Sequence, residues 1–451
     1  MNFFKQYLHW PTITFISIAF VWVAFNNARW NDHKVLRWDT YGYSQYLSSW
    51  FIYENIKDPQ ELIRIDSLYH PTDDLMYYGR HWVDRGRAIA FKYTMGNAIM
   101  MSPFYLTAHL ITKSTKFFPA DGYSEPYQFS VALSSLFWGI CGMVALTLLL
   151  LRWFRPTTVS VTLLLIAFGT NYLYYVTLEC GLTHVPDFFL ITSAVLCTFL
   201  WLEQKCWKYA FLVGLASGMV ALIRLPDMVF GIIPAVLFLK TFFESTRNEK
   251  NKLLLQAGAI TVVVGLIFSP QMIYWKYVSG YWFHDSYVGE KFDFLYPHIS
   301  DGLFSYKKGW LLYAPIMIFA LAGIPLLLKK FHWIGYCVAM YVCIHIYVVF
   351  SWGEWWYGGS FGSRPMIQAY GILAIPLACF MNEFFLKNFF AKKFFSGAMI
   401  LVVTFFVSLN LFQTYQYKLG ILHYTNMNKT AYWGIWGKLR LTDSEFKEYY
   451  K

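Results

Sequence analysis

Uncharged apolar runs of 18 or more residues recur along this chain, and they constrain its fold more than any other feature. Inside a bilayer every backbone N–H and C=O needs a partner within the protein, so only helices and closed barrels cross it. The runs are continuous instead of alternating between apolar and polar residues, which argues against barrel strands. At 57% hydrophobic and 14% charged residues, the chain is also too apolar for an ordinary soluble domain. We therefore predict an all-α polytopic membrane protein.

Eleven segments are predicted to span the membrane. The first, at about 10–25, has no small-residue cleavage site after it and is interpreted as an uncleaved anchor. The other ten lie at about 127–151, 156–178, 185–202, 209–224, 227–241, 253–273, 309–328, 333–351, 365–383 and 394–413. Residues 1–413 then form one transmembrane domain. The tail 414–451 is too short for an ordinary separate domain and is expected to pack on the outer face.

A further run at 93–112 is ambiguous because it contains Gly96, Asn97, Pro103 and His109. If it does not cross, 14 Lys and Arg residues lie on the cytoplasmic side and 8 in short outer loops; if it crosses, the counts are 9 and 13. Positive residues favour the cytoplasmic side. We therefore predict that 93–112 is an interfacial or re-entrant helix, with the N-terminus of the chain inside and its C-terminus outside.

The net charge of +11 fits basic cytoplasmic loops that face anionic lipid. The basic residues are scattered instead of clustered, so we expect no nucleic-acid partner.

This topology collects the polar segments of the chain on its outer side. They include the first outer loop, 28–126, with predicted juxtamembrane helices, and the outer loop 274–308. A transporter more typically carries its polar groups near mid-membrane, on broken helices in two repeated halves. Here no clear internal repeat is present and the polar groups lie at the ends of spans, which favours a site at the outer membrane surface.

Asp39 lies in the first outer loop, in the sequence Trp38-Asp-Thr-Tyr-Gly-Tyr43. A loop aspartate often caps a helix, but beside a membrane surface it can also act as a general base. We expect Tyr43 to contact a substrate. Elsewhere in the loop, His70, His81 and Asp84 match no specific metal motif, so the metal ligands, if the protein has any, stay unassigned.

Three ionisable residues, Glu179, His184 and Asp187, fall within nine residues between two predicted spans. Such groups can be ordinary loop residues, but three of them beside a proline at a helix start are typical of a functional site. We predict that Glu179 and His184 bind substrate. Arg224 lies shortly before Pro226-Asp227. It is interpreted either as the partner of Asp227 in an ion pair that closes a turn, or as a guanidinium that binds a phosphate.

The most distinctive short motif is Ser351-Trp-Gly-Glu-Trp-Trp-Tyr-Gly-Gly-Ser-Phe-Gly-Ser-Arg-Pro365. Its glycines allow close backbone approach, and its aromatic residues suit a lipid headgroup layer or a sugar face. Glu354 and Trp356 are predicted to bind substrate. Arg364 could be a plain snorkelling arginine, but its surroundings favour contact with an anionic headgroup.

Taken in order, these motifs resemble the GT-C superfamily of membrane glycosyltransferases, in particular the bacterial branch similar to protein O-mannosyltransferases and aminoarabinose transferases. The resemblance covers nearly the whole chain. It rests on Trp38–Tyr43, Lys92-Tyr-Thr-Met-Gly96, Ser102-Pro-Phe104, Thr183-His-Val-Pro186, Leu222-Ile-Arg-Leu-Pro226, Gly302–Pro315 and Gly359–Pro365. Thr40 stands where the family often has Glu, which leaves a second catalytic carboxylate unassigned.

The resemblance implies a sugar donor carried on a polyprenyl phosphate and an acceptor glycan, lipid or protein. Since the leaving phosphate is already a stable anion, one base and a set of cations suffice for transfer. Asp39 would be the base, and single-step attack would invert the anomeric centre. The phosphate would be held by Arg364, Arg224, Lys307 and Lys308. A divalent metal ion is left open as a cofactor, and the implied location is the bacterial inner membrane with the site on its periplasmic face.

Two other classes of protein stay open from the sequence. A lipid or sugar-lipid transporter would also use aromatic, Arg-lined outer pockets, but it would not need Asp39. A transferase similar to O-antigen ligases would use a diphosphate donor and place its key residues in a long central outer loop. Here the first outer loop is the richest in polar residues, which argues against that class.

Overall fold

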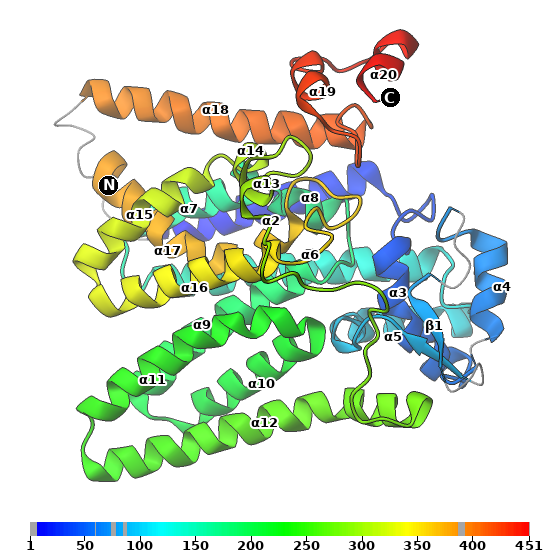
Figure 1. Cartoon of the computed structure of the whole chain (residues 1–451), viewed down its shortest axis with the longest axis horizontal. Helices are drawn as coiled ribbons and strands as arrows, with labels where there is room; N and C mark the ends of the chain where they lie inside the picture. The colour runs from blue at the N-terminus through cyan, green and yellow to red at the C-terminus, as the bar shows by residue number, and fades with distance from the viewer. Residues whose placement is uncertain (1–6, 59, 74–77, 84–87, 387–392, 451) are drawn as a thin grey trace.

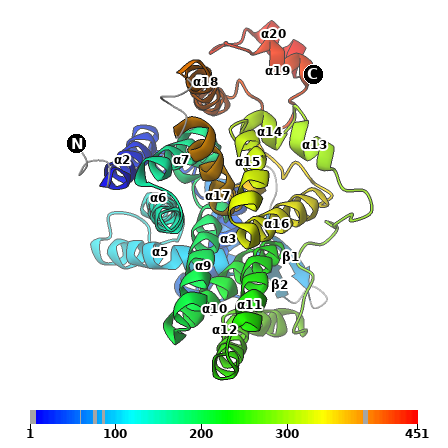
Figure 2. The same cartoon turned by 90° about the vertical axis from the view of Figure 1, so that its left-hand side faces the viewer.

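The computed structural model describes residues 7–58, 60–73, 78–83, 88–386 and 393–450. Long helices lie side by side along one direction, and Figure 2 shows most of them close to end-on. They are α2 (His9–Asn27), α6 (Glu125–Leu150), α7 (Pro156–Gly169), α9 (His184–Gln204), α10 (Trp207–Ile223), α11 (Ile232–Glu244), α12 (Arg247–Ser279), α15 (Met317–Lys330), α16 (His332–Phe350), α17 (Tyr370–Phe380) and α18 (Lys393–Lys418), and the short helix α8 (Tyr172–Thr177) follows α7. The chain is a multi-pass helical membrane protein.

Each of the eleven predicted spans overlaps helical structure, but their number stays a prediction. Within the described ranges, seven helices are long and apolar enough to cross a membrane, and three shorter apolar helices accompany them. The shorter ones include α7, which ends at Gly169 and is followed by the separate helix α8, and α17, which begins only after the 3-10 turn Arg364–Met366. Breaks in the backbone therefore divide some apolar runs that the sequence shows as continuous.

The first outer loop folds into a compact unit at one end of the bundle (Figure 1). It contains α3 (Trp38–Leu47), the π-helical turn Ser48–Ile52, α4 (Gln60–Tyr69) and α5 (Gly96–Thr115), which confirms helices in this loop. It also contains an antiparallel pair of strands, β1 (Arg80–Val83) and β2 (Ala88–Phe91), in which Arg80 pairs with Phe91. The prediction of an all-α fold is wrong in this detail, because β2 is a fully buried apolar strand that was too short to recognise from periodicity.

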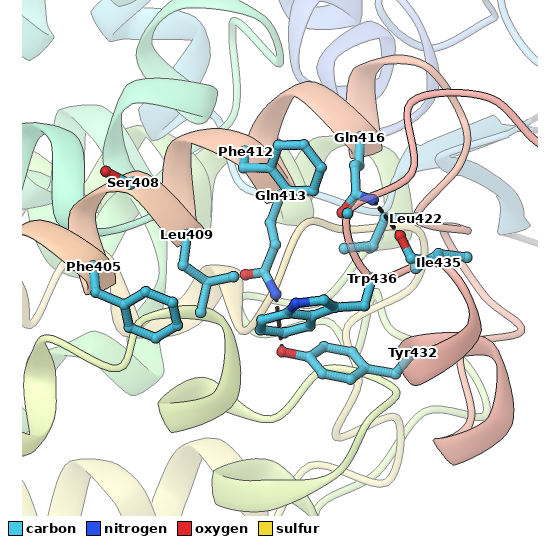
Figure 3. A pocket seen from close by; sticks show the side chains of 11 residues that line it. Phe405, Ser408, Leu409, Phe412, Gln413, Gln416, Leu422, Tyr432, Ile435 and Trp436 are labelled. Carbon is cyan, nitrogen blue, oxygen red and sulfur yellow. Dashed lines mark hydrogen bonds between the residues drawn. The ribbon is translucent and has the colours of Figure 1, made fainter. Parts of the chain in front are cut away.

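Helix burial depends on where each helix lies in the bundle and not on its apolarity alone. α17 is apolar on all sides, and its residues Tyr370–Cys379 are all buried in the centre of the bundle. α18 lies at the periphery, with the tail helices α19 (Lys429–Gly434) and α20 (Asp443–Tyr449) beyond it (Figures 1 and 2). The tail thus packs against the end of α18 (Figure 3), while α18 leaves much of its own surface exposed.

The N-terminus of α5 is held against two membrane helices. Thr94 Oγ1 donates to the Ile223 carbonyl at 3.1 Å, and the Met95 N–H donates to Gln271 Oε1 at 2.8 Å. A Cβ on Gly96 would lie 2.5 Å from the Ile223 nitrogen and from the Leu222 carbonyl carbon. Only glycine permits this backbone contact, which fixes the first outer loop beside the end of α10.

We expect Gly96→Ala to lower the stability of the folded protein by about 1–3 kcal/mol, because backbone atoms cannot yield to the added methyl group. Thermal unfolding of the purified protein in detergent measures the change. Gly258→Ala is the matched control, since a Cβ there meets nothing within 4 Å. Equal melting temperatures for the two variants would contradict the close contact.

Candidate functional site

A cavity of about 1290 Å³ opens at the end of the bundle where the first outer loop lies. Its walls come from segments far apart in the sequence: the first outer loop, the turn after α8, the end of α10, the loop after α12, the 351–364 motif and the end of α18. Seven residues predicted from the sequence line it together: Asp39, Tyr43, Glu179, His184, Arg224, Glu354 and Arg364. Lys307, Lys308 and Trp356 are not part of this lining.

Asp39 is placed by the first turn of α3, where a negative charge is favoured by the helix dipole. Its Oδ2 lies 2.7 Å from Arg364 Nη2, and the two side chains are only 12% and 16% exposed. Its Oδ1 accepts hydrogen bonds from the hydroxyls of Tyr93, at 2.7 Å, and Tyr78. Gly42 makes room for this arrangement, because a Cβ there would lie 2.4 Å from the Tyr93 ring.

These contacts determine the charge state of Asp39. Burial opposes its ionisation, but the positive charge of Arg364 and the hydrogen bonds from Tyr78 and Tyr93 outweigh burial and hold its pKa well below the usual range. Asp39 is therefore an ionised carboxylate whose two oxygens are both engaged. It becomes a stronger base only when one of these partners moves away.

Arg224 lines the cavity and belongs to a hydrogen-bonded network in its wall. Its Nε lies 3.4 Å from Asp227 Oδ2, so the predicted turn-closing ion pair is present. Gln368 Nε2 donates to both Asp227 oxygens, at 2.9 and 3.1 Å, and its Oε1 lies 3.0 Å from His184 Nδ1. The Arg224 guanidinium also faces the Tyr357 ring, at 5.8 Å from its centroid.

Gln368 and Arg224 both face His184 Nδ1. Because the Gln368 amide nitrogen must face the Asp227 carboxylate, its oxygen faces Nδ1 at 3.0 Å and favours a proton there. Arg224 Nη1, which can only donate, lies farther from the same nitrogen, at 3.4 Å. A neutral His184 then keeps Nε2 as its hydrogen-bond acceptor. Gln368 was missed from the sequence, where its only mark is a polar side chain one turn after Arg364 in an otherwise apolar span.

The two predicted lysines are engaged by other parts of the chain. Lys308 is 2% exposed, and its Nζ donates to the Ser360 carbonyl. Burial lowers the pKa of Lys308 to about 7, with the nearby charges of Arg364 and Lys307 adding to the effect. Lys307 Nζ lies 3.7 Å from the centroid of the Trp356 ring. A phosphate could reach Lys308 only after its contact with Ser360 is released, whereas Lys307 is partly exposed beside the Trp356 ring.

Glu179 and Glu354 lie on different parts of the cavity wall. Glu179 Oε2 is 3.6 Å from Arg29 Nη1 and accepts a hydrogen bond from Tyr174 at 3.0 Å. Glu354 is exposed in the turn before Tyr357. Glu354 therefore has a carboxylate open to the cavity, whereas that of Glu179 is already paired.

The loop after α12 is fastened to the first outer loop beside the cavity. Lys92 forms an ion pair with Glu290. His81 Nε2 lies 2.8 Å from His284 Nε2, with the two rings stacked at 5.1 Å between centroids. Both histidines have lowered pKa values, because burial disfavours their charged forms; His284 lowers that of His81 further, and Asp285 opposes both shifts. Of the three residues considered for a metal, Asp84 lies outside the described residues.

This histidine pair is expected to separate as the pH falls. The pKa values of His81 and His284 are lowered while the two rings are in contact, so both side chains bind protons better when the loop has moved away. The contact is therefore favourable above about pH 6.5, and it is lost as the pH falls through the lowered pKa values. A fluorophore on Val288→Cys, an exposed position in the loop, reports its mobility. Replacing both histidines by Asn should remove the pH dependence; an unchanged response would exclude the pair as its cause.

The surroundings of Asp39 do not fit a metal ion. Its three contacts are a guanidinium and two hydroxyls, all hydrogen-bond donors, whereas a divalent cation needs several oxygen lone pairs turned toward it. Across the described part of the chain, no group of three or more His, Cys, Asp or Glu side chains is placed to hold a metal.

Comparison with known proteins rests on structure. A scan against protein-family models finds no match, and a search of curated proteins finds none either. The structure is similar to that of the archaeal oligosaccharyltransferase AglB from Archaeoglobus fulgidus in complex with an inhibitory peptide and a dolichol-phosphate. That comparison gives a TM-score of 0.58 and 14% identity over 99% of this chain and 60% of that chain.

Two further structures of the Archaeoglobus fulgidus oligosaccharyltransferase are similar. One, tethered with an acceptor peptide containing the NVT sequon, aligns with a TM-score of 0.56 and 14% identity, over 100% of this chain and 59% of that chain. Another, a complex with Zn and sulfate, has a TM-score of 0.50 and 14% identity over 97% and 56%. This chain thus spans about 60% of the length of its structural neighbours. The comparison confirms the predicted GT-C fold, while the bacterial branch stays a prediction.

Proposed function

We propose that this chain, which has the GT-C fold, is a membrane glycosyltransferase that moves a sugar from a polyprenyl-phosphate carrier to an acceptor hydroxyl. The observation that carries the proposal is the 2.7 Å contact between Asp39 and Arg364 on the wall of the large cavity. It places a carboxylate that can take a proton beside a guanidinium that can hold a phosphate. The archaeal neighbour in complex with a dolichol-phosphate supports a lipid-linked donor.

Binding of the donor would itself activate the base. The donor phosphate, a diester with one negative charge, competes with Asp39 for the Arg364 guanidinium, whose planar fork suits either partner. Once Arg364 turns to the phosphate, Asp39 loses its strongest charge partner and its pKa rises toward the usual range. Arg224, held by Asp227 on the same cavity wall, would supply a second positive charge.

The transfer step balances without any further reactant. The acceptor oxygen forms a bond to the anomeric carbon and gives its proton to Asp39, while the bond between that carbon and the phosphate oxygen breaks. The bonding electrons leave with the polyprenyl phosphate, which departs as an anion held by Arg364 and Arg224. Attack from the face opposite the phosphate inverts the anomeric centre. Tyr43, Glu354 and His184 are proposed to contact the sugar or the acceptor.

The proposed location is the bacterial cytoplasmic membrane, with the cavity on its periplasmic face. The support is the distribution of Lys and Arg residues, which favours the opposite end of the bundle as the cytoplasmic side. A complex of the archaeal neighbour with Zn and sulfate keeps a divalent ion open as a cofactor. The donor sugar would be presented from the outer leaflet to an acceptor glycan, lipid or protein.

Two measurements together test this function. Mass spectrometry of surface glycans is expected to show one modification missing from a deletion strain. Purified protein in lipid vesicles, given a donor that carries that sugar and envelope material of the deletion strain as acceptor, is expected to release free polyprenyl phosphate. Movement of an intact sugar-lipid across the vesicle membrane without release of the phosphate would instead assign the chain as a transporter.

A further inference from the structure

Asp187 is a buried acid that the transfer step does not use. It follows His184 by three residues in the first turn of α9, is 0% exposed and does not line the large cavity. Residues three apart in a helix lie on the same face, so Asp187 shares the neighbours of His184. Its carboxyl group lies within hydrogen-bonding reach of the Asp227 carboxyl group. Two buried acids therefore meet in the wall of the cavity.

The hydrogen-bond donors around these two acids face Asp227. Arg224 Nε lies 3.4 Å from Asp227 Oδ2, and Gln368 Nε2 donates to both Asp227 oxygens, at 2.9 and 3.1 Å. Among the residues that the structure describes, no donor faces either carboxyl oxygen of Asp187. One guanidinium thus serves two carboxyl groups.

Two other polar side chains beside the acids leave this balance unchanged. Tyr341 has a buried, neutral hydroxyl group. His345, whose ring stacks on that of Tyr341 at 5.2 Å between centroids, is aimed elsewhere: its Nε2 lies 3.2 Å from the Pro365 carbonyl, which accepts the Nε2 proton. Neither side chain supplies the second positive charge that two ionised acids would need.

The charge balance indicates that Asp187 is neutral. A buried carboxylate without a cation or a donor is so costly that the group keeps its proton instead. With Asp187 protonated, the charges of Asp227 and Arg224 cancel; with both acids ionised, two like charges would be in contact and one of them would be unpaired. Two carboxyl groups in contact also need a proton between them to form a hydrogen bond.

We propose that Asp187 is a neutral carboxylic acid that donates a hydrogen bond to Asp227, and that it is a positioning residue for Arg224. This hydrogen bond occupies a lone pair of Asp227, so Asp227 holds the guanidinium less tightly and Arg224 can turn toward an anion. An ionised Asp187 would instead compete with that anion. The role of Arg224 toward an anion rests on the proposed function, whereas the shared proton does not.

Infrared spectroscopy of the purified full-length protein detects the shared proton without any substrate. The unaltered protein at neutral pH should show the carbonyl stretch of a protonated carboxylic acid, and Asp187→Asn should lose it. Asp121→Asn is the matched control. Asp121 is also buried, but it accepts hydrogen bonds from the Tyr69 hydroxyl and from the N–H groups of Tyr123 and Ser124, which favour its ionised form. Its replacement should leave the band unchanged.

Binding of a polyprenyl phosphate with three isoprenoid units, measured by native mass spectrometry in detergent, tests the effect on Arg224. Asp187→Asn keeps an N–H donor for Asp227 and should bind this phosphate as the unaltered protein does. Asp187→Leu is similar in size but has no donor, so Asp227 would hold Arg224 more tightly. The phosphate should then bind about tenfold more weakly.

Three results would overturn the proposal in different parts. An acid band that is absent from the unaltered protein, or equally strong in Asp187→Asn, would reject the shared proton. Equal phosphate binding by Asp187→Leu and Asp187→Asn would reject the positioning role. A protein that shows the expected band but binds none of the phosphate would reject the polyprenyl-phosphate donor, while the shared proton would stand.

Discussion

Asp39→Asn is expected to lower sugar transfer by about 10²–10⁴-fold, the usual contribution of a positioned general base. Asparagine preserves the size of the side chain and can still accept hydrogen bonds from Tyr78 and Tyr93, but it cannot take a proton from the acceptor. Donor binding should persist or tighten, because Arg364 loses its carboxylate partner. The measurement is turnover of a polyprenyl-phosphate sugar, with donor affinity determined separately.

The control for this variant is Asp73→Asn. Asp73 also lines the large cavity, but it is largely exposed and pairs with Arg37 at the rim. Its replacement should leave turnover near that of the unaltered protein. If Asp39→Asn protein inserts normally and transfers sugar at full rate, Asp39 is not part of the mechanism and the transporter interpretation gains support.

Arg364→Ala should have the second largest effect, because it removes both the phosphate clamp and the charge that holds Asp39 ionised. A hydrogen bond to a charged group contributes about 1.5–3 kcal/mol, which corresponds to about 10–100-fold weaker donor binding. Loss of the guanidinium also raises the pKa of Asp39, since Arg364 is the main influence that lowers it. The acid side of the pH profile of kcat/KM should therefore move to higher pH.

Arg364→Lys separates the two roles of Arg364. Lysine keeps the positive charge, so the pH profile should stay close to that of the unaltered protein, but it lacks the planar fork and should still weaken donor binding. Arg37→Ala removes another cation that lines the same cavity, at its rim. It tests whether the effect on donor binding is specific to Arg364. A pH profile that does not move in Arg364→Ala would show that Asp39 is not the titrating base.

Several site residues could be predicted from local sequence, and others could not. His184, Arg224 and Arg364 stand out because each is ionisable and lies at the end of an apolar run, and Asp39 stands out as an acid among aromatic residues in the first outer loop. Gln368 does not, because a single neutral amide in a span resembles many packing residues. Tyr78 and Tyr93 are two of 34 tyrosines, so composition alone could not mark them as partners of Asp39.

The sequence by itself determined that the chain is a helical membrane protein whose polar segments meet at the ends of its spans. The length and apolarity of each run are sufficient to predict a spanning helix, since the bilayer imposes the same requirement on every segment that crosses it. Only the tertiary structure decided that Asp39 meets Arg364 and that Gln368 joins His184 to Asp227. These contacts depend on how helices pack against one another, and packing is set by the shapes of many side chains together, which no single stretch of sequence contains.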